Sequence, residues 1–224
     1  YWDIPSQNFV YADVDGNIAY QTPSLIPIRA NGQGMVPVPG WTGEYEWQGY
    51  IPYEELPALL NPEQGYIVTA NNAVVDEQYP YFIARDWASG DRAQRITAMI
   101  DAAIADGPID ADDFARIHFD SYSTRAESYV PLLTGLASDD AEVQRALALL
   151  RDWDYQERRD SVATSIFEMF YMHLVRNVLS DDLGEENYLD GHSTIYFHQL
   201  ANLPDARWWD DVTTPKVETR EDIL

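Results

Sequence analysis

The hydrophobic pattern of this chain changes its period near residue 90. Before that point, apolar residues form short alternating runs separated by Gly and Pro, as in strands and loops. From Asp91 they recur every three or four residues, as on one face of a helix. A chain of 224 residues, 46% of them apolar, can bury a sizeable core. We therefore expect an α+β protein, with a β-rich segment over residues 1–90 and a mainly helical segment over residues 91–224, together forming one domain.

Alternation and turn residues predict the strands. Asn8–Ala12 and Asn17–Gln21 flank Asp15-Gly16, a dipeptide suited to the positive φ values of a tight hairpin turn. Leu25–Ala30 is a further short candidate strand, and Tyr66–Ala70 restores the β pattern just before a pair of asparagines. We expect all of these strands to lie in the first segment.

A long excursion rich in Gly, Pro and Trp occupies Asn31–Pro62. Its prolines lack backbone donors and its glycines loosen the chain, so long regular elements are excluded there. Aromatic rings interleaved with glutamates could stack on sugars, but packing of the excursion onto the sheet is the interpretation that we prefer. The rings concerned are Trp41, Tyr45, Trp47, Tyr50 and Tyr53.

The helical segment divides at turn and capping residues. The first helix places Ala93, Ile96, Ile100 and Ile104 on one face and ends at Asp106-Gly107-Pro108. Further helices are predicted over Asp110–Phe119, Arg125–Leu136, Asp140–Trp153, Ser161–Leu179, Glu185–Ala201 and Glu218–Leu224. In Ser161–Leu179, Asp160 is the predicted N-cap, and Val162, Ile166, Phe170, Leu174 and Val178 form the predicted apolar face.

The charge of the chain excludes two classes of partner. Thirty-eight acidic residues face 14 basic ones, giving a net charge of −24. Nucleic acids and anionic membranes both require clustered Lys and Arg, so we expect neither as a partner. The acidity is interpreted as a solubilising surface, with carboxylates around a divalent cation as the alternative. There is no Cys, which excludes disulfides and thiolate metal sites, and no apolar run reaches the roughly 18 residues of a membrane span.

Three stretches carry a resemblance to a known family. They are NFVYADVDGNIAY (Asn8–Tyr20), VPVPGWTGEYEWQGYIP (Val36–Pro52) and NPEQGYIVTANN (Asn61–Asn72). Together they resemble the β chain of the penicillin acylase family, within the N-terminal nucleophile hydrolases. The resemblance continues through Arg92 and, more loosely, through Ile117–Leu133 and Ser161–Phe170. It implies a four-layer αββα sandwich of antiparallel sheets between helices, and a periplasmic or secreted protein.

The family chemistry requires a residue that is not found at position one. Its members attack an amide carbonyl with the side chain of the first β-chain residue, freed by self-cleavage, and the α-amino group acts as the base. Ser, Thr or Cys could do this, whereas Tyr1 has no hydroxyl on Cβ, and the nitrogen of Ser6 is tied up in a peptide bond. We therefore interpret the chain as an internal fragment of a β chain, truncated at both ends and inactive alone. Its partners would be the α chain and the remainder of the β chain.

The resemblance implies two site residues. Asn71 would point its side-chain amide at the carbonyl oxygen under attack, as an oxyanion donor, and Arg92 would support it. From residue type alone, an Asn pair after a strand is more often a turn, and Arg92 a surface residue. The implied reaction cleaves the amide between an acyl group and an amine in a small molecule, such as a β-lactam antibiotic or a related N-acyl compound. It needs no cofactor, and the acyl specificity cannot be read from this sequence.

The chain contains further groups of acidic residues and four histidines. The family carries a structural Ca²⁺ near Asp76, Glu77 and Asp86, but this chain is slightly shorter between Asn71 and Arg92, so its calcium ligands stay unassigned. Carboxylate pairs suggestive of a glycoside hydrolase sit in no motif; they are Asp152 with Asp154, and Asp110 with Asp112 and Asp113. The histidines, His118, His173, His192 and His198, lack a paired metal-ligand spacing. The competing hypothesis is a non-catalytic carbohydrate-binding or interaction protein.

Overall fold

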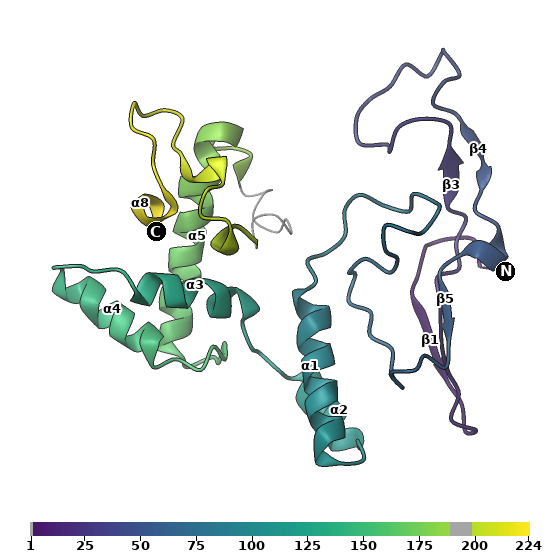
Figure 1. Cartoon of the computed structure of the whole chain (residues 1–224), viewed down its shortest axis with the longest axis horizontal. Coiled ribbons are helices and arrows are strands. Elements are labelled where there is room, and N and C mark those ends of the chain that lie inside the picture. Colours follow the sequence, from purple (N-terminus) through teal and green to yellow (C-terminus); the bar gives the residue numbers. More distant parts are fainter. Residues whose placement is uncertain (1, 189–198) are drawn as a thin grey trace. The chain divides into compact units, whose positions relative to one another are not determined.

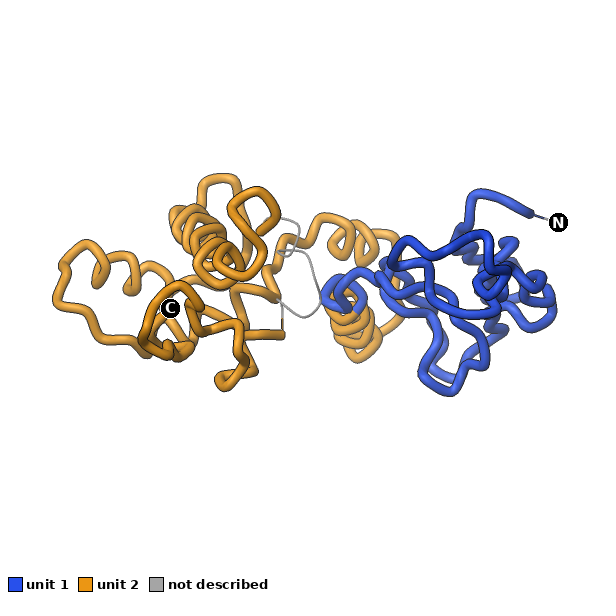
Figure 2. The backbone as a smooth tube through the Cα atoms, turned by 90° about the horizontal axis from the view of Figure 1, so that it is seen from above, with its two compact units in different colours: residues 1–93 blue, residues 94–224 orange. Residues whose placement is uncertain are grey.

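The computed structural model of this chain describes residues 2–188 and 199–224. It contains two compact units, residues 1–93 and residues 94–224 (Figure 2). Strands lie in the first unit and helices dominate the second (Figure 1). None of the helices in the described ranges is both long enough and apolar enough to cross a lipid bilayer.

A three-stranded antiparallel sheet organises unit 1. It contains β1 (Phe9–Ala12), β2 (Ile18–Gln21) and β5 (Ala58–Leu60), in the order β1-β2-β5. The predicted hairpin is confirmed, with Phe9 opposite Gln21. Its connection is wider than a two-residue turn, because the Asp13 carboxylate accepts hydrogen bonds from the backbone N–H groups of Asp15 and Asn17.

A second, two-stranded sheet pairs β3 (Pro27–Arg29) with β4 (Trp47–Tyr50). A 3₁₀ turn, η1 (Tyr53–Glu55), follows before β5. The excursion thus holds only short elements, as its Gly and Pro content predicts. Buried Ile26, Ile51 and Leu56 form a small core beside these strands, with Ile28, Tyr81 and Ile83 packed against it.

The predicted strand Tyr66–Ala70 is wrong. Residues 61–90 form no strand, and Tyr66–Ala70 makes no ladder with any described strand. An alternating sequence pattern matches the side chains of a strand, but a strand also needs a neighbouring strand to form hydrogen bonds with its backbone N–H and C=O groups. The stretch is instead an irregular approach to Asn71.

The expectation that the aromatic excursion packs onto the sheet is also wrong for most of its rings. Trp41 is 88% exposed, Trp47 is 59% exposed, and Tyr50 and Tyr53 are exposed as well. Trp47 and Tyr50 contact each other edge to face, with ring centroids 6.2 Å apart. Tyr45 is partly buried and lies beside Gly32. Trp47 and Tyr50 lie on β4, Trp41 and Tyr53 lie outside the strands, and all four rings are exposed.

The helical part contains the predicted helices with small shifts of their ends. The bounds are α1 (Asp91–Asp106), α2 (Ala111–His118), α3 (Thr124–Thr134), α4 (Ala141–Arg151), α5 (Val162–Leu183) and α8 (Arg220–Ile223), with 3₁₀ turns η2 (Leu200–Asn202) and η3 (Arg207–Trp209). The helix predicted over Glu185–Ala201 falls largely on residues 189–198, which lie outside the described residues. α1 ends at Asp106 as predicted, but Ile100 is its only buried residue, so its apolar face is narrower than the spacing indicated.

Side-chain caps fix where the helices begin. Asp110 accepts hydrogen bonds from the N–H groups of Asp112 and Asp113, and Asp140 caps α4 in the same way. α5 begins one residue later than predicted, because Ser161 rather than Asp160 is the cap that accepts from the backbone of Thr164. Each cap satisfies donors that the first turn leaves free.

α5 (Val162–Leu183) buries a different face from the one predicted at its N-terminal end. Val162 is exposed and Ile166 and Phe170 are only partly buried. An ideal helix has 3.6 residues per turn, so a series with a step of four drifts around the axis and cannot stay on one face. The buried residues are Ala163, Phe167, Tyr171, Leu174, Val175, Val178 and Leu179, and they form one core with residues of α3, η2 and η3, including Tyr129, Leu200 and Trp209.

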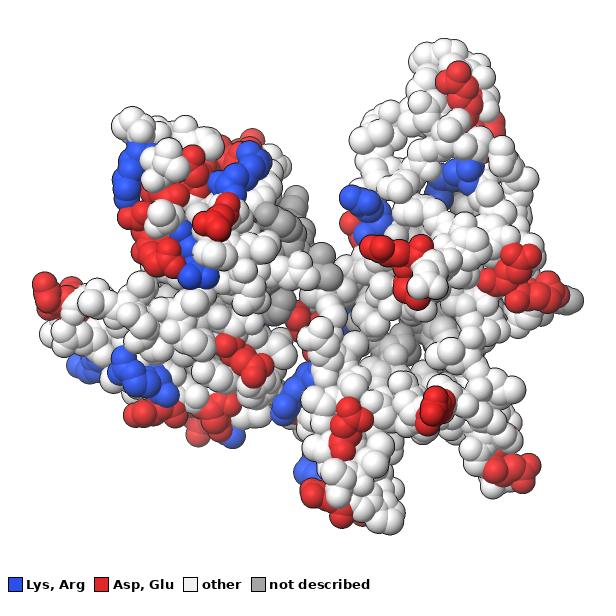
Figure 3. Space-filling model, in the orientation of Figure 1, with Lys and Arg blue, Asp and Glu red and all other residues white. Residues whose placement is uncertain are grey.

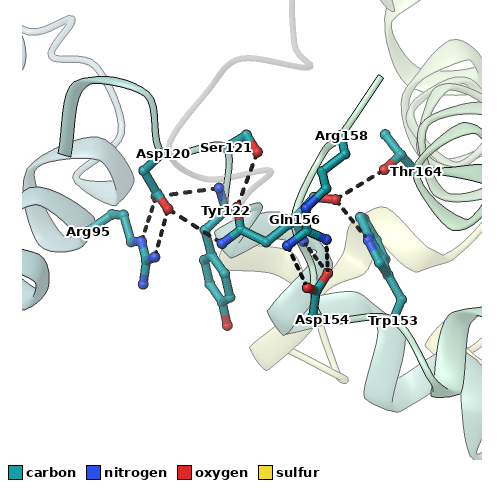
Figure 4. Close-up of polar contacts among 9 residues, drawn as sticks. All are labelled: Arg95, Asp120, Ser121, Tyr122, Trp153, Asp154, Gln156, Arg158 and Thr164. Carbon is teal, nitrogen blue, oxygen red and sulfur yellow. Dashed lines mark hydrogen bonds and ion pairs between the residues drawn. The ribbon is translucent and has the colours of Figure 1, made fainter. Parts of the chain in front are cut away.

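A polar network lies beside this core in unit 2 (Figure 4). Arg95 donates two hydrogen bonds to the Asp120 carboxylate, at 2.7 and 2.8 Å, and its guanidinium lies 4.3 Å from the centre of the Tyr122 ring. Tyr122 pairs with Gln156 in an isolated β-bridge, and Gln156 donates to the same carboxylate. The hydrogen bonds from Arg95 hold the pKa of the Asp120 carboxyl below its usual value of 3.8.

This lowered pKa predicts an acid-dependent stability. Because the carboxylate is favoured in the folded state, its contribution is present above the unfolded pKa and is lost as the pH falls through the folded pKa. We expect Asp120→Asn to lower the free energy of unfolding at pH 7 and to differ less and less from the parent chain below about pH 4. Urea unfolding at a series of pH values, followed by circular dichroism, measures this. In an Arg95→Gln background the effect of Asp120→Asn should shrink; an equal effect at every pH and in both backgrounds would contradict it.

Candidate active site

Asn71 has a backbone conformation that few residues adopt readily. It lies in the irregular stretch between β5 and α1, with a φ of +62°. Asn tolerates this left-handed region better than most residues with a side chain. The Asn71 carbonyl accepts a hydrogen bond from the backbone N–H of Ala88, at 2.9 Å. The turn at Asn71 is therefore tied to the stretch that leads into α1.

Arg92, in the first turn of α1, fixes the Asn71 side chain. One nitrogen of its guanidinium, Nη2, donates to Asn71 Oδ1 at 2.8 Å and to the Ala70 carbonyl at 3.0 Å. Because Oδ1 accepts from a cation, the amide nitrogen Nδ2 must occupy the other end of the group. Among the described residues, Nδ2 has no hydrogen-bond acceptor. Asn71 and Arg92, the two predicted site residues, thus lie together. The Nδ2 group of Asn71 can donate a hydrogen bond to a ligand.

The Asn72 side chain has different hydrogen-bond partners. Its Oδ1 accepts from the backbone N–H of Ala70, and its Nδ2 donates to the Ala73 carbonyl, each at 3.0 Å. Both ends of its amide therefore stabilise the turn itself. The neighbouring amides differ in role: Asn72 builds the turn and Asn71 projects from it.

Asn71 borders a pocket of about 430 Å³ within unit 1. The wall is a nearly even mixture of apolar and polar surface, and the polar part includes the segment before β1 and the residue after β2. The lining residues are Ser6, Gln7, Asn8, Thr22, Leu25, Ile26, Pro27, Asn71, Val74, Ile83, Ala84 and Trp87. Such a volume and such a mixture of walls are typical of small-molecule sites.

The polar part of the wall is held by its own hydrogen bonds. The Tyr20 hydroxyl donates to Asn8 Oδ1, and Ser6 and Ser24 share a hydrogen bond between their hydroxyls at 2.6 Å. No His, Asp, Glu or Lys is among the described residues that line the pocket. Ser6 therefore has no side-chain base beside it and does not form an activated nucleophile here. Tyr1 lies outside the described residues.

The pocket walls were missed by the sequence analysis. Asn8 lies in one of the family-like stretches, but no spacing shows that Ser6–Asn8 and Leu25–Pro27 face Asn71. Thr22 and Ser24 follow β2 and are buried, but burial is seen only in the structure, so the sequence holds no signal for these walls.

The calcium candidates do not form a site. Among the described residues, no group of three or more His, Asp or Glu side chains is placed to hold a metal ion. One Asp76 oxygen accepts from the backbone N–H of Gln78, so this carboxylate closes a local turn. Asp76, Glu77 and Asp86 are all exposed. The described part of this chain therefore supplies no calcium cage of its own.

Three of the five remaining carboxylate candidates have structural partners. Asp110 and Asp113 form the capping box of α2. Asp154 forms an ion pair with Arg158, whose hydrogen bond lowers the pKa of this carboxyl. His118 and His173 are exposed, while His192 and His198 lie outside the described residues. None of the described residues among these candidates lines the pocket beside Asn71.

Comparison with solved structures defines the fold. The chain is similar to thermostable penicillin G acylase from Alcaligenes faecalis, with a TM-score of 0.66 and 24% sequence identity, over 83% of this chain and 35% of that one. This likeness concerns the fold, that of the N-terminal nucleophile hydrolases. The predicted α+β class, with antiparallel strands first and helices later, is confirmed.

Comparison with known sequences defines the family. The family model described as Penicillin amidase matches residues 1–224. The chain is 34% identical to penicillin acylase 2 proenzyme from Pseudomonas sp. (strain SE83) over 79% of its length, and 29% identical to acyl-homoserine lactone acylase QuiP from Pseudomonas aeruginosa over 97% of its length. It therefore belongs to the penicillin amidase family. It spans 23% and 28% of those two relatives.

The different roles of the two asparagines can be separated by hydrogen exchange. Asn72→Ala removes the acceptor for the Ala70 N–H, whereas Asn72→Asp keeps an oxygen in its place. We expect the Ala70 amide to exchange about threefold to tenfold faster in Asn72→Ala, since one hydrogen bond contributes about 1 kcal/mol. In Asn72→Asp it should stay close to the parent rate. Equal protection of this amide in both variants would show that the Asn72 side chain does not hold the turn.

Proposed function

We propose that this chain is part of a longer acylase that hydrolyses the amide bond between an acyl group and an amine through a covalent acyl-enzyme. The observation that carries the proposal is the Asn71 amide beside a pocket: Arg92 holds its oxygen, and no described residue accepts a hydrogen bond from its nitrogen. Membership of the penicillin amidase family supports it.

In this proposal Asn71 is the oxyanion donor. When a nucleophile attacks an amide carbonyl, negative charge develops on its oxygen, and a donor held in place before the reaction stabilises that charge. The Asn71 amide meets this requirement because its turn and its Oδ1 are both tethered. Loss of one such donor typically lowers the rate about 10²- to 10³-fold.

Arg92 is the residue that positions it. Its hydrogen bonds to Ala70 and Asn71 fix the side-chain rotamer and decide which end of the amide faces away from α1. A cation on Oδ1 also draws electron density from the amide, which makes Nδ2 a better donor. Arg92 therefore acts through Asn71.

The pocket beside Asn71 would accept part of the substrate. Leu25, Ile26 and Trp87 give it apolar surface, while Gln7 and Asn8 add polar groups. The relatives are named as acylases of penicillin and of acyl-homoserine lactones, and we extend to this chain only what these share: a small N-acyl substrate. Apolar pockets separate related acyl groups by only about 1–3 kcal/mol per methylene, so the fold alone does not select one.

The nucleophile would come from outside this chain. The family chemistry needs a Ser, Thr or Cys with a free α-amino group, which we assign to the first residue of the mature β chain. The partners are then the α chain and the remainder of the β chain, released by self-cleavage of one precursor. In support, this chain spans about a quarter of its relatives, one of which is named a proenzyme. By family resemblance we also place the protein in the periplasm or outside the cell.

The exposed rings of the excursion favour a second function, surface recognition. Trp41, Trp47 and Tyr50 could bind a carbohydrate without any catalysis. A glycan array with the intact protein and a Trp41→Ala variant tests this alternative. Family membership makes the acylase the better supported of the two.

The oxyanion role of Asn71 predicts a specific kinetic change in the processed, full-length protein. Asn71→Ala should lower kcat about 10²- to 10³-fold and leave KM nearly unchanged, because the donor acts where charge develops. Steady-state hydrolysis of a chromogenic acyl amide measures this, and a gel shows whether both chains have formed. The matched control, Asn72→Ala, should keep most of the rate. A correctly processed Asn71→Ala enzyme with most of its kcat would overturn the assignment.

A further inference from the structure

Arg29 stands out among the cations of unit 1. This unit contains three arginines, Arg29, Arg85 and Arg92, and no lysine. Arg92 donates to Ala70 and Asn71, and Arg85 is exposed to solvent. Arg29 is half-buried, and no described residue provides its guanidinium with a carboxylate or another hydrogen-bond acceptor. A guanidinium without an anion beside it can pair with a carboxylate supplied by a ligand or partner.

Local backbone geometry explains how Arg29 is held. The register of β3 against β4 shifts between Ile28, which pairs with Gly49, and Arg29, which pairs with Trp47, as at a β-bulge. Bulges redirect the side chains beside them. The guanidinium lies against the backbone of Gly34, where an added Cβ would be 3.5 Å from its Nη2. The group is thus supported on one side by main chain.

A second, smaller pocket opens beside Arg29. Its volume is about 190 Å³, and Tyr81, Phe82, Pro27 and Pro80 provide most of its apolar wall. The Tyr81 hydroxyl donates to the Glu55 carboxylate, so this nearby acid is already engaged. The pocket wall therefore combines aromatic rings, prolines and the Arg29 guanidinium, to which no described residue provides an acceptor. It shares only Pro27 with the pocket beside Asn71.

We propose that this pocket binds a small monocarboxylate that carries a compact aromatic or branched apolar group. The planar guanidinium of Arg29 suits bidentate hydrogen bonding to a carboxylate, and the rings and prolines suit the apolar part. The inference does not depend on the proposed acylase function. Salt screens the acidic side chains of the chain (Figure 3) beyond about 8 Å, so the acids that oppose anion binding are those close to the pocket, such as Glu55 beside Tyr81.

Benzoate is a suitable probe, and benzamide is its neutral counterpart of the same shape. Titration of the ¹⁵N-labelled full chain with benzoate should shift amide signals of residues 27–32 and 80–82, while benzamide should shift them far less. Arg29→Gln should weaken benzoate binding at least about tenfold, since a charged hydrogen bond contributes about 1.5–3 kcal/mol. The matched control Arg85→Gln changes an exposed arginine in the same unit and should bind as the parent chain does.

Two further comparisons keep the test decisive. If Arg29→Gln does not fold, Arg29→Lys keeps the charge but loses the bidentate geometry and should bind benzoate more weakly than the parent chain. The titration of the parent chain with both probes needs no variant at all. The proposal is overturned if benzoate leaves residues 27–32 and 80–82 unshifted, if benzamide binds equally well, or if a folded Arg29→Gln chain binds benzoate as the parent does. Failure of this test leaves the Asn71 kinetics unaffected, so the two proposals are judged separately.

Discussion

The hydrogen bonds from Arg92 to Ala70 and Asn71 are the interaction on which the candidate site depends. They join the first turn of α1 to a turn more than 20 residues earlier in the chain. The intervening stretch has no strand or helix to stiffen it, so its end positions rely on contacts of this kind. Asn71 also has a left-handed backbone, which most side chains would disfavour. The Arg92 guanidinium, which α1 positions, thus sets the orientation of the Asn71 amide, which the turn positions.

The location of each residue's interaction partner also explains which parts of the structure could be predicted from the sequence. Predictions from local sequence patterns were correct where the hydrogen-bond partner of a residue lies only a few positions away in the chain. Asp110 and Asp140 cap helices with their side chains, and the hairpin around Gly16 is closed within a few residues. The Asn71 and Arg92 pair was placed by family resemblance, because no local pattern connects residues so far apart.

Prediction failed where the decisive partner lies elsewhere in the chain. Tyr66–Ala70 alternates like a strand, yet no described strand pairs with it. The rings at Trp41 and Trp47 have the size of core residues, yet both are exposed, and neither is among the residues that pack against the Ile26 core. The pocket wall around Gln7 and the Arg29 guanidinium, which has no acceptor among the described residues, depend on the tertiary structure. No spacing of residues in the sequence indicates either of them.

The central claim is that Arg92 holds the Asn71 amide so that Nδ2 faces the reacting carbonyl oxygen. A crystal structure of the processed, full-length protein with a sulfonyl fluoride inhibitor bound covalently to its nucleophile would test this directly. The account predicts Asn71 Nδ2 at about 2.7–3.1 Å from a sulfonyl oxygen, the distance at which oxyanion donors act, with Arg92 still bonded to Oδ1. An Asn71 amide turned away from the adduct, or a different donor on that oxygen, would contradict it.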